Sequence, residues 1–209
     1  MLRCTSTKLA LTGLIAAAAV ALLPSAALAA SPRCEAKEGD TVARNTTTRV
    51  FMRTTGTVDD GQDVRIYSCR LGTRTAVLTT RFRNDLDGEL RLQEAILGSS
   101  KYLGIVFEEL TGTSDSTDVF LYDLSVPDRR YFTFNRDGSR EGLQAVVTRN
   151  GGLAVLDAGV VTVFDAAGTR IVGPSGASAL GWGIGTNTVY WTAGSTPFST
   201  TLNGRPSES

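Results

Sequence analysis

The stretch that decides the fold is Val119-Phe-Leu-Tyr-Asp-Leu-Ser-Val-Pro-Asp-Arg129, which recurs as Val161-Thr-Val-Phe-Asp-Ala-Ala-Gly-Thr-Arg170. Each copy is an apolar segment that ends at an aspartate and is followed by a turn and an arginine. Fainter copies follow Val64 and Val189. A strand–turn–strand unit that repeats along a chain indicates an array architecture. We therefore expect similar antiparallel units to follow one another.

Four units can be laid out, spanning residues 49–78, 102–134, 152–172 and 180–202. An additional apolar segment precedes the second unit at Leu92–Leu97 and the third at Leu143–Val147, and each predicts a strand that leads into its unit. The fourth unit ends too early to supply an outer strand. We expect the segment at residues 41–50 to pair either with that unit or with the first.

Both side-chain rows of the repeated strand are apolar. Val119 and Leu121 face one way, while Phe120 and Tyr122 face the other. Strict alternation with polar residues would predict one solvated face, whereas two apolar rows predict a sheet that is covered on both faces. Stacked blades provide such cover. The prediction is an all-β fold of antiparallel repeat units in a small or partial β-propeller of about four blades, with a β-sandwich as the alternative.

The units resemble the repeats of bacterial extracytoplasmic β-propellers of the Tol-type and WD-like kind. In those repeats a strand of alternating aliphatic and aromatic residues ends at an aspartate, and an arginine-containing strand follows the turn. Asp123 and Asp165 occupy the aspartate position, whereas Ser68 and Thr192 replace it in the first and fourth units. The resemblance covers residues 41–202. It implies a binding surface more often than catalysis.

The N-terminal residues read as a signal peptide at positions 1–29. Arg3 and Lys8 form a basic start, Leu9–Leu23 is an apolar run of signal-peptide length, and Ala27-Leu28-Ala29 is a small-residue cleavage site. Residues 30–202 then form the repeat domain, and the polar residues 203–209 are expected to be a disordered tail. The prediction is a secreted or cell-envelope protein, of bacterial type by its composition, with no membrane insertion after cleavage.

Cys34 and Cys69 are the two cysteines that follow the signal segment. An even number of cysteines in an oxidising compartment predicts a disulfide between them. Removing Arg3 and Lys8 from the 21 basic residues leaves 19 against 21 acidic ones, a net charge of −2. This charge gives no support for binding nucleic acid.

The chain has no histidine, which excludes the catalytic triads and metal sites that depend on imidazole. Paired carboxylates can hydrolyse glycosides without histidine. Neighbouring acids in turns are more often solvated, and a strand-end aspartate more often caps its turn. No residue is therefore assigned as catalytic, and we favour a protein that is not an enzyme. The acid pairs that remain open are Glu108 with Glu109, Asp59 with Asp60, and Asp123 with Asp165.

Three loops have the alternating oxygen ligands that calcium prefers. The best candidate set is Asp85, Asp87 and Glu89; the others lie at 135–139 and 114–118. Asp-Gly is also a common hairpin signal, so we favour simple turns and assign no metal or other cofactor. The aromatic residues of the fourth unit, Trp182, Tyr190, Trp191 and Phe198, are expected in the core more than at a ligand.

Together these features predict a secreted or cell-envelope binding or scaffold module without catalysis. Its partner would be a protein or a glycan of unknown identity. The alternatives are a carboxylate-dependent carbohydrate-active enzyme and a structural domain that assembles with copies of itself.

Overall fold

The computed structural model describes residues 33–35, 39–57, 59–84, 88–111, 115–126 and 129–207. The predicted signal peptide at residues 1–29 lies outside this part of the chain. In the described part of the chain every regular element is a β-strand and none is a helix, which confirms the all-β class. Within the same residues, no helix has the length and apolar character needed to cross a membrane.

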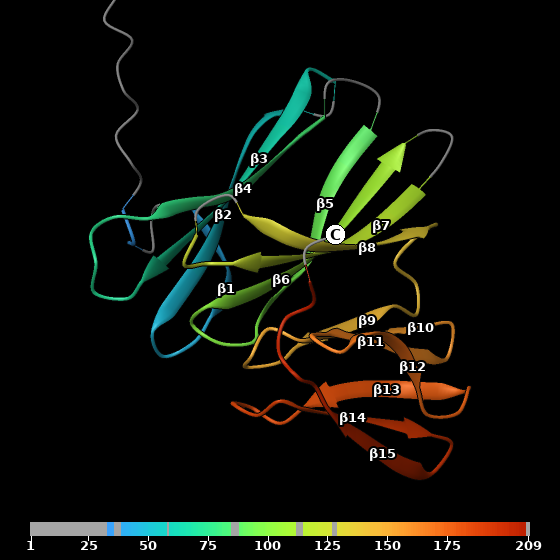
Figure 1. The fold of residues 1–209 in the computed structure, drawn as a ribbon. Coiled ribbons are helices and arrows are strands. Elements are labelled where there is room, and N and C mark those ends of the chain that lie inside the picture. Colours follow the sequence, from blue (N-terminus) through green and yellow to red (C-terminus); the bar gives the residue numbers. More distant parts are fainter. Residues whose placement is uncertain are drawn as a thin grey trace, which may run out of the picture. The chain divides into compact units, whose positions relative to one another are not determined.

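The described strands form four antiparallel sheets, in each of which strands that follow one another in sequence are paired (Figure 1). The first sheet contains β1 (Asp40–Arg44), β2 (Thr48–Thr57), β3 (Gly61–Arg70) and β4 (Val77–Asn84). The second contains β5 (Gly88–Leu97), β6 (Tyr102–Thr111), β7 (Asp115–Asp123) and β8 (Arg130–Asp137). The third contains β9 (Gln144–Val147), β10 (Leu153–Asp157), β11 (Val160–Asp165) and β12 (Gly168–Val172). The fourth contains β13 (Ala177–Trp182), β14 (Thr188–Ala193) and β15 (Thr196–Thr201).

The two clear copies of the repeat occupy the same place in consecutive sheets. Residues 119–123 end β7 and residues 161–165 end β11, and each of these strands is the third of its sheet, with a paired strand on both sides. The predicted lead-in strands are β5 and β9. At the N-terminus β1 pairs with β2, so the early segment completes the first unit and not the fourth. The repeat therefore describes equivalent strands.

The side chains of β7 enter two different cores. Phe120 and Tyr122 belong to a buried cluster with residues of the first sheet, whereas Val119 and Leu121 belong to a cluster with residues of the third. Both faces of the second sheet are therefore covered, as the two apolar rows predict. Each such side chain contributes about 1.5–3 kcal/mol when fully removed from water.

The third sheet is likewise covered on both faces. Phe164 packs toward the second sheet, while Val161 and Val163 pack with Val189 and Trp191 of the fourth. The clusters thus join consecutive sheets, four in all, rather than the two sheets of the alternative sandwich. Within the described residues none of these sheets closes on itself.

A glycine permits the close approach of the second and third sheets. A Cβ atom added at Gly104 of β6 would lie 2.5 Å from Cγ2 of Val147 on β9. Atoms cannot approach so closely, so any larger residue at position 104 would push the sheets apart.

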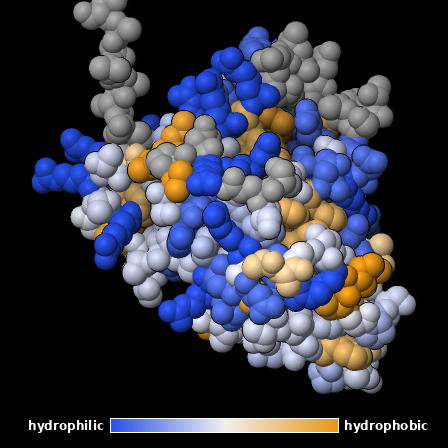
Figure 2. Space-filling model, in the orientation of Figure 1, coloured by the Kyte–Doolittle hydropathy of each residue, from blue (hydrophilic) through white to orange (hydrophobic). Residues whose placement is uncertain are grey.

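The face in Figure 2 is mainly hydrophilic, and the hydrophobic side chains on it form small separate patches. The most exposed large apolar residues are Ile184, at 93% exposure, and Ile171, at 70%. Isolated apolar residues of this kind are normal on a protein surface. The apolar contribution to stability therefore comes mainly from the clusters between the sheets.

The predicted disulfide between Cys34 and Cys69 is confirmed, with Cα atoms 5.8 Å apart. It lies in a cluster with Phe51 and Tyr67 on the first sheet. The guanidinium of the buried Arg49 extends the same attachment, because it donates hydrogen bonds to the carbonyl oxygens of Glu35 and Gly39. The segment before β1 is therefore attached to the first sheet by covalent and polar contacts.

The end of the chain also has specific contacts. Leu202 is buried at 1% exposure in the cluster between the third and fourth sheets, and Pro206 is buried as well. The guanidinium carbon of Arg205 lies 5.2 Å from the ring centroid of Tyr131 on β8. Asn203, Arg205 and Pro206 thus contact the sheets, in a segment for which a disordered tail was expected. Residues 208–209 lie outside the described part.

Candidate functional site

A cleft of about 610 Å³ lies at the ends of strands from the first two sheets. Its lining comes from the start of β2, the end of β3, the β3–β4 turn, the start of β4, and the turns that follow β5 and β7. The lining residues are Thr47, Thr48, Ser68, Cys69, Arg70, Thr73, Thr75, Val77, Ser100 and Leu124. A cleft of this volume is in the range that holds small molecules.

Antiparallel topology explains why these segments meet. In a meander, alternate turns lie at the same end of a sheet. The β1–β2 and β3–β4 turns therefore share one end of the first sheet, and the β5–β6 and β7–β8 turns share one end of the second. The cleft is lined by residues from both of these ends, so the two ends lie beside each other.

The rim before β2 is held in place by an asparagine. The carboxamide oxygen of Asn45 accepts hydrogen bonds from the backbone N–H groups of Thr47, at 2.9 Å, and Thr48, at 2.8 Å. An asparagine that binds the backbone two or three residues ahead fixes a turn. The lining threonines on this side are thus supplied by an ordered turn.

The hydroxyl groups of the cleft differ in whether they can still donate a hydrogen bond to a ligand. Thr73 donates its hydroxyl hydrogen to the carbonyl oxygen of Arg70 at 2.7 Å. Ser68 instead accepts a hydrogen bond from the hydroxyl of the buried Thr79 at 2.9 Å. Because a serine hydroxyl can donate once and accept twice, Ser68 keeps its own hydrogen for the cleft. Ser68 is also the residue that replaces the repeat aspartate in the first unit.

Asp123 lies beside the cleft and caps the turn that carries Leu124. Its Oδ1 accepts a hydrogen bond from the backbone N–H of Ser125 at 3.0 Å, and Lys101 Nζ lies 3.5 Å from Oδ2. Burial acts to raise the pKa of Asp123, but the hydrogen bonds from Ser125 and the charge of Lys101 outweigh it and hold the pKa below its usual value. Asp123 is therefore an ionised turn cap.

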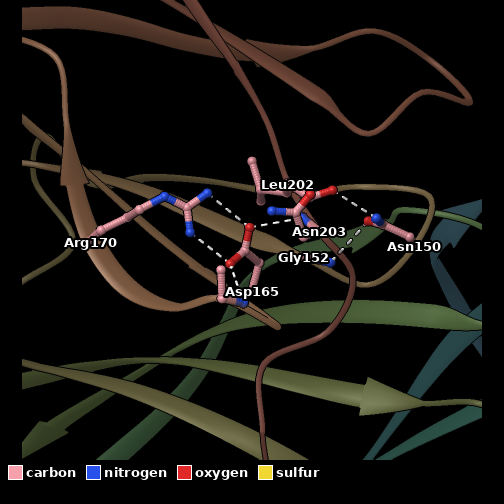
Figure 3. A network of polar contacts seen from close by, with 7 residues as sticks. Asn150, Gly152, Asp165, Arg170, Leu202 and Asn203 are labelled. Atoms are coloured by element: carbon pink, nitrogen blue, oxygen red, sulfur yellow. Dashed lines mark hydrogen bonds and ion pairs between the residues drawn. The ribbon is translucent and has the colours of Figure 1, made fainter.

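Asp165 has the same role in the third sheet (Figure 3). Its carboxylate accepts hydrogen bonds from the backbone N–H groups of Ala167, at 2.9 Å, and Asn203, at 2.8 Å, and it forms a two-point ion pair with Arg170. The Arg170 guanidinium, against the opposing effect of burial, holds the pKa of Asp165 below its usual range. The fully buried carboxylate thus joins a hairpin to the segment that follows β15.

Asn150 holds the same segment through a contact with Leu202, which Figure 3 also shows. The side-chain amide of Asn150 donates to the carbonyl oxygen of Leu202 at 2.8 Å, and its backbone N–H donates to Asn187 Oδ1 at 3.1 Å. We interpret these hydrogen bonds as structural, because they hold the end of the chain in place.

The other acid pairs do not reach the cleft. Glu108 is buried on β6 and accepts hydrogen bonds from Gln93 Nε2 and from the backbone N–H of Arg140, whereas the adjacent Glu109 is exposed. Asp59 and Asp60 are exposed in the β2–β3 turn. Among the described residues, the lining of the cleft contains no carboxylate. The structure thus separates these acids from the cleft.

The structure describes only part of the predicted calcium sets. Asp85 and Asp87 lie outside the described residues, and Glu89 forms an ion pair with Arg91. In the loop at 135–139, the side-chain amide of Asn135 donates to Asp118 Oδ1 at 2.8 Å. Over the part of the chain that is described, no three acidic or cysteine side chains gather as metal ligands.

The aromatic residues of the fourth sheet divide between core and surface. Trp191 is buried and stacks on Phe198 with ring centroids 5.8 Å apart. Trp182 packs against two of the clusters, and Tyr190 is exposed at 49%. In the part of the chain that the structure describes, no aromatic ring lines the cleft itself.

Comparison of the chain with protein-family models, with curated proteins and with solved structures found no match. The fold and the cleft therefore define the protein as an all-β chain of four antiparallel sheets with a hydroxyl-lined hollow between the first two. Sequence reasoning missed this hollow. The only signal was the frequency of threonine at 45–48 and 71–76, and threonine is common in turns of any function.

Proposed function

We propose that the protein is a secreted or cell-envelope binding module with a propeller-like arrangement of sheets, and that the cleft at the ends of the first two sheets is its binding site. The single observation that carries the proposal is the cleft, with its volume of about 610 Å³ and its convergent hydroxyl groups. The disulfide is compatible with an oxidising, extracytoplasmic compartment. The ligand would be a small molecule, or an exposed group on a glycan or protein.

Two features support a preorganised site. Ser68 and Thr48 are more than 90% buried and are carried by paired strands, so their positions are set by the sheet. Asn45 fixes the adjoining turn through two backbone hydrogen bonds. A site built on rigid elements loses little conformational freedom when a ligand binds.

The proposal is tested by blocking the cleft. Thr75 is exposed and lines the hollow, so Thr75→Trp would fill it without disturbing a buried cluster. The matched control is Thr196→Trp, at an exposed threonine on β15. The protein, expressed from its full sequence, is screened by thermal shift against a library of metabolites and glycans, and each hit is measured by calorimetry.

The expected result is a ligand that binds the parent and the Thr196→Trp variant but loses at least tenfold in affinity with Thr75→Trp. Equal binding by both variants would place the site elsewhere and contradict the proposal. Release of hydrolysed sugar from a bound glycan would instead favour the carbohydrate-active enzyme.

A further inference from the structure

We infer that the cleft recognises an oxyanion on its ligand: a sulfate, phosphate or carboxylate group. This inference rests on the proposed function and specifies the chemistry of the same site. It starts from the polar side chains of the lining, which are six hydroxyl groups and one guanidinium. An oxyanion presents hydrogen-bond acceptors. The guanidinium can donate to them, and so can the hydroxyl of Ser68, whereas the hydroxyls of Thr47 and Thr73 already donate to Asn45 and Arg70.

Arg70 supplies the charge. It is the one charged residue of the lining, and it forms no ion pair with a carboxylate in the described part of the chain. A guanidinium can only donate, and it binds the oxygens of an anion through parallel hydrogen bonds. The carbonyl oxygen of Arg70 accepts the hydroxyl of Thr73, which fixes the backbone from which the side chain extends.

The described residues around the cleft do not cancel this charge. Lys101 and Asp123, at the rim formed by the second sheet, already pair with each other. Arg74, in the same β3–β4 turn as Thr73 and Thr75, adds a further exposed cation. The rim is therefore locally positive on a mature chain whose expected net charge is −2.

Two hydroxyl groups can complete the recognition. Ser68, which receives the hydrogen of Thr79, has its own hydrogen to donate toward the cleft. Ser100 lies across the hollow in the β5–β6 turn of the second sheet. An anion between Arg70 and these hydroxyls would thus be bound from both sheets. A neutral sugar has fewer partners here, because the described lining contains no aromatic ring for stacking and no carboxylate or amide to accept its hydroxyl hydrogens.

The test compares charged and neutral forms of one ligand. Calorimetry measures the binding of glucose, glucose 6-sulfate, glucose 6-phosphate and glucuronate to the protein expressed from its full sequence. The variants are Arg70→Gln, which keeps a polar side chain but removes the charge, and Ser68→Ala. The control is Arg149→Gln, at an exposed arginine in the β9–β10 turn. Circular dichroism verifies that each variant is folded.

We expect at least one charged sugar to bind about tenfold or more tightly than glucose, because hydrogen bonds to charged groups are stronger than neutral ones. Arg70→Gln should remove that difference, Arg149→Gln should retain it, and added salt should weaken it. The three charged forms distinguish sulfate, phosphate and carboxylate.

Two outcomes would overturn the inference in different ways. If a neutral ligand binds, is blocked by Thr75→Trp and is unaffected by Arg70→Gln, the oxyanion is wrong while the binding module stands. If charged and neutral ligands alike bind equally well to the Thr75→Trp variant, both the oxyanion and the proposed site are wrong.

Discussion

Arg170 holds Asp165 with both arms of its guanidinium: Nη1 lies 2.7 Å from Oδ1 and Nη2 lies 2.9 Å from Oδ2. The carboxylate is fully buried, while a third of the Arg170 side chain is exposed. The pair spans the β11–β12 hairpin, and Asn203 adds a backbone hydrogen bond to the same carboxylate. One acid thus connects the repeat strand of the third sheet with the end of the chain.

Removal of this charge should be costly. Asp165→Asn leaves Arg170 without its counter-charge and cannot accept every hydrogen bond that the carboxylate accepts. We expect the free energy of unfolding to fall by about 3 kcal/mol, as for other broken buried pairs. Urea denaturation measures it. Asp137→Asn, at an exposed position on β8, is the control and should change stability by less than about 0.5 kcal/mol. Equal effects of the two substitutions would contradict the role of the pair.

Stability at low pH should depend on Asp63. Hydrogen bonds from Arg81 and Arg65, at 2.7 and 2.6 Å, outweigh the opposing effect of burial and lower the pKa of Asp63 from 3.8 to about 2. Because the folded-state pKa is depressed, the stabilisation is complete above the unfolded pKa near 3.8 and is lost as the pH falls through about 2.

Asp63→Asn removes that pH-linked stabilisation. Its unfolding free energy, measured from denaturant curves between pH 4 and pH 2, should decrease less steeply than that of the parent. Asp60→Asn, in the adjoining turn, should follow the parent curve. Parallel curves for Asp63→Asn and the parent would show that the pKa is not depressed in the folded protein.

The disulfide should contribute substantially to stability. It joins residues 35 positions apart, and a loop of that length corresponds to about 3.5–4 kcal/mol on the chain-entropy model. We expect the Cys34→Ala/Cys69→Ala double variant to have a free energy of unfolding that is lower by this amount, as measured by urea denaturation. Dithiothreitol should lower the unfolding midpoint of the parent toward that of the variant and leave the variant unchanged. A parent that is insensitive to reduction would contradict this prediction.

Two adjacent residues test whether both faces of the second sheet are buried. Phe120 packs toward the first sheet and Leu121 toward the third, and both are buried. Phe120→Ala and Leu121→Ala should each reduce the unfolding free energy by about 3 kcal/mol, because each leaves a cavity in a different cluster. Ile171→Ala, at 70% exposure, is the control and should have little effect. A small loss for either buried residue would mean that its face of the sheet is open.

The strand pattern could be predicted from the sequence because it depends on neighbouring residues. Alternation within residues 119–123 separated Val119 and Leu121 from Phe120 and Tyr122, and the structure places these two rows in different clusters. Turn capping by Asp165 was also expected, because an aspartate binds backbone N–H groups two residues ahead. The partner Asn203 was not, because it lies 38 residues further along the chain.

The amino-acid sequence by itself determined the β-strands, the cysteine pair and the equivalence of β7 and β11, because these depend on side-chain alternation and on the chemistry of single residues. The tertiary structure alone decided which turns meet. Thr47, Ser68, Ser100 and Leu124 become neighbours only when the first two sheets align their ends. A cleft is a property of that alignment, and no local pattern of hydroxyl residues encodes it.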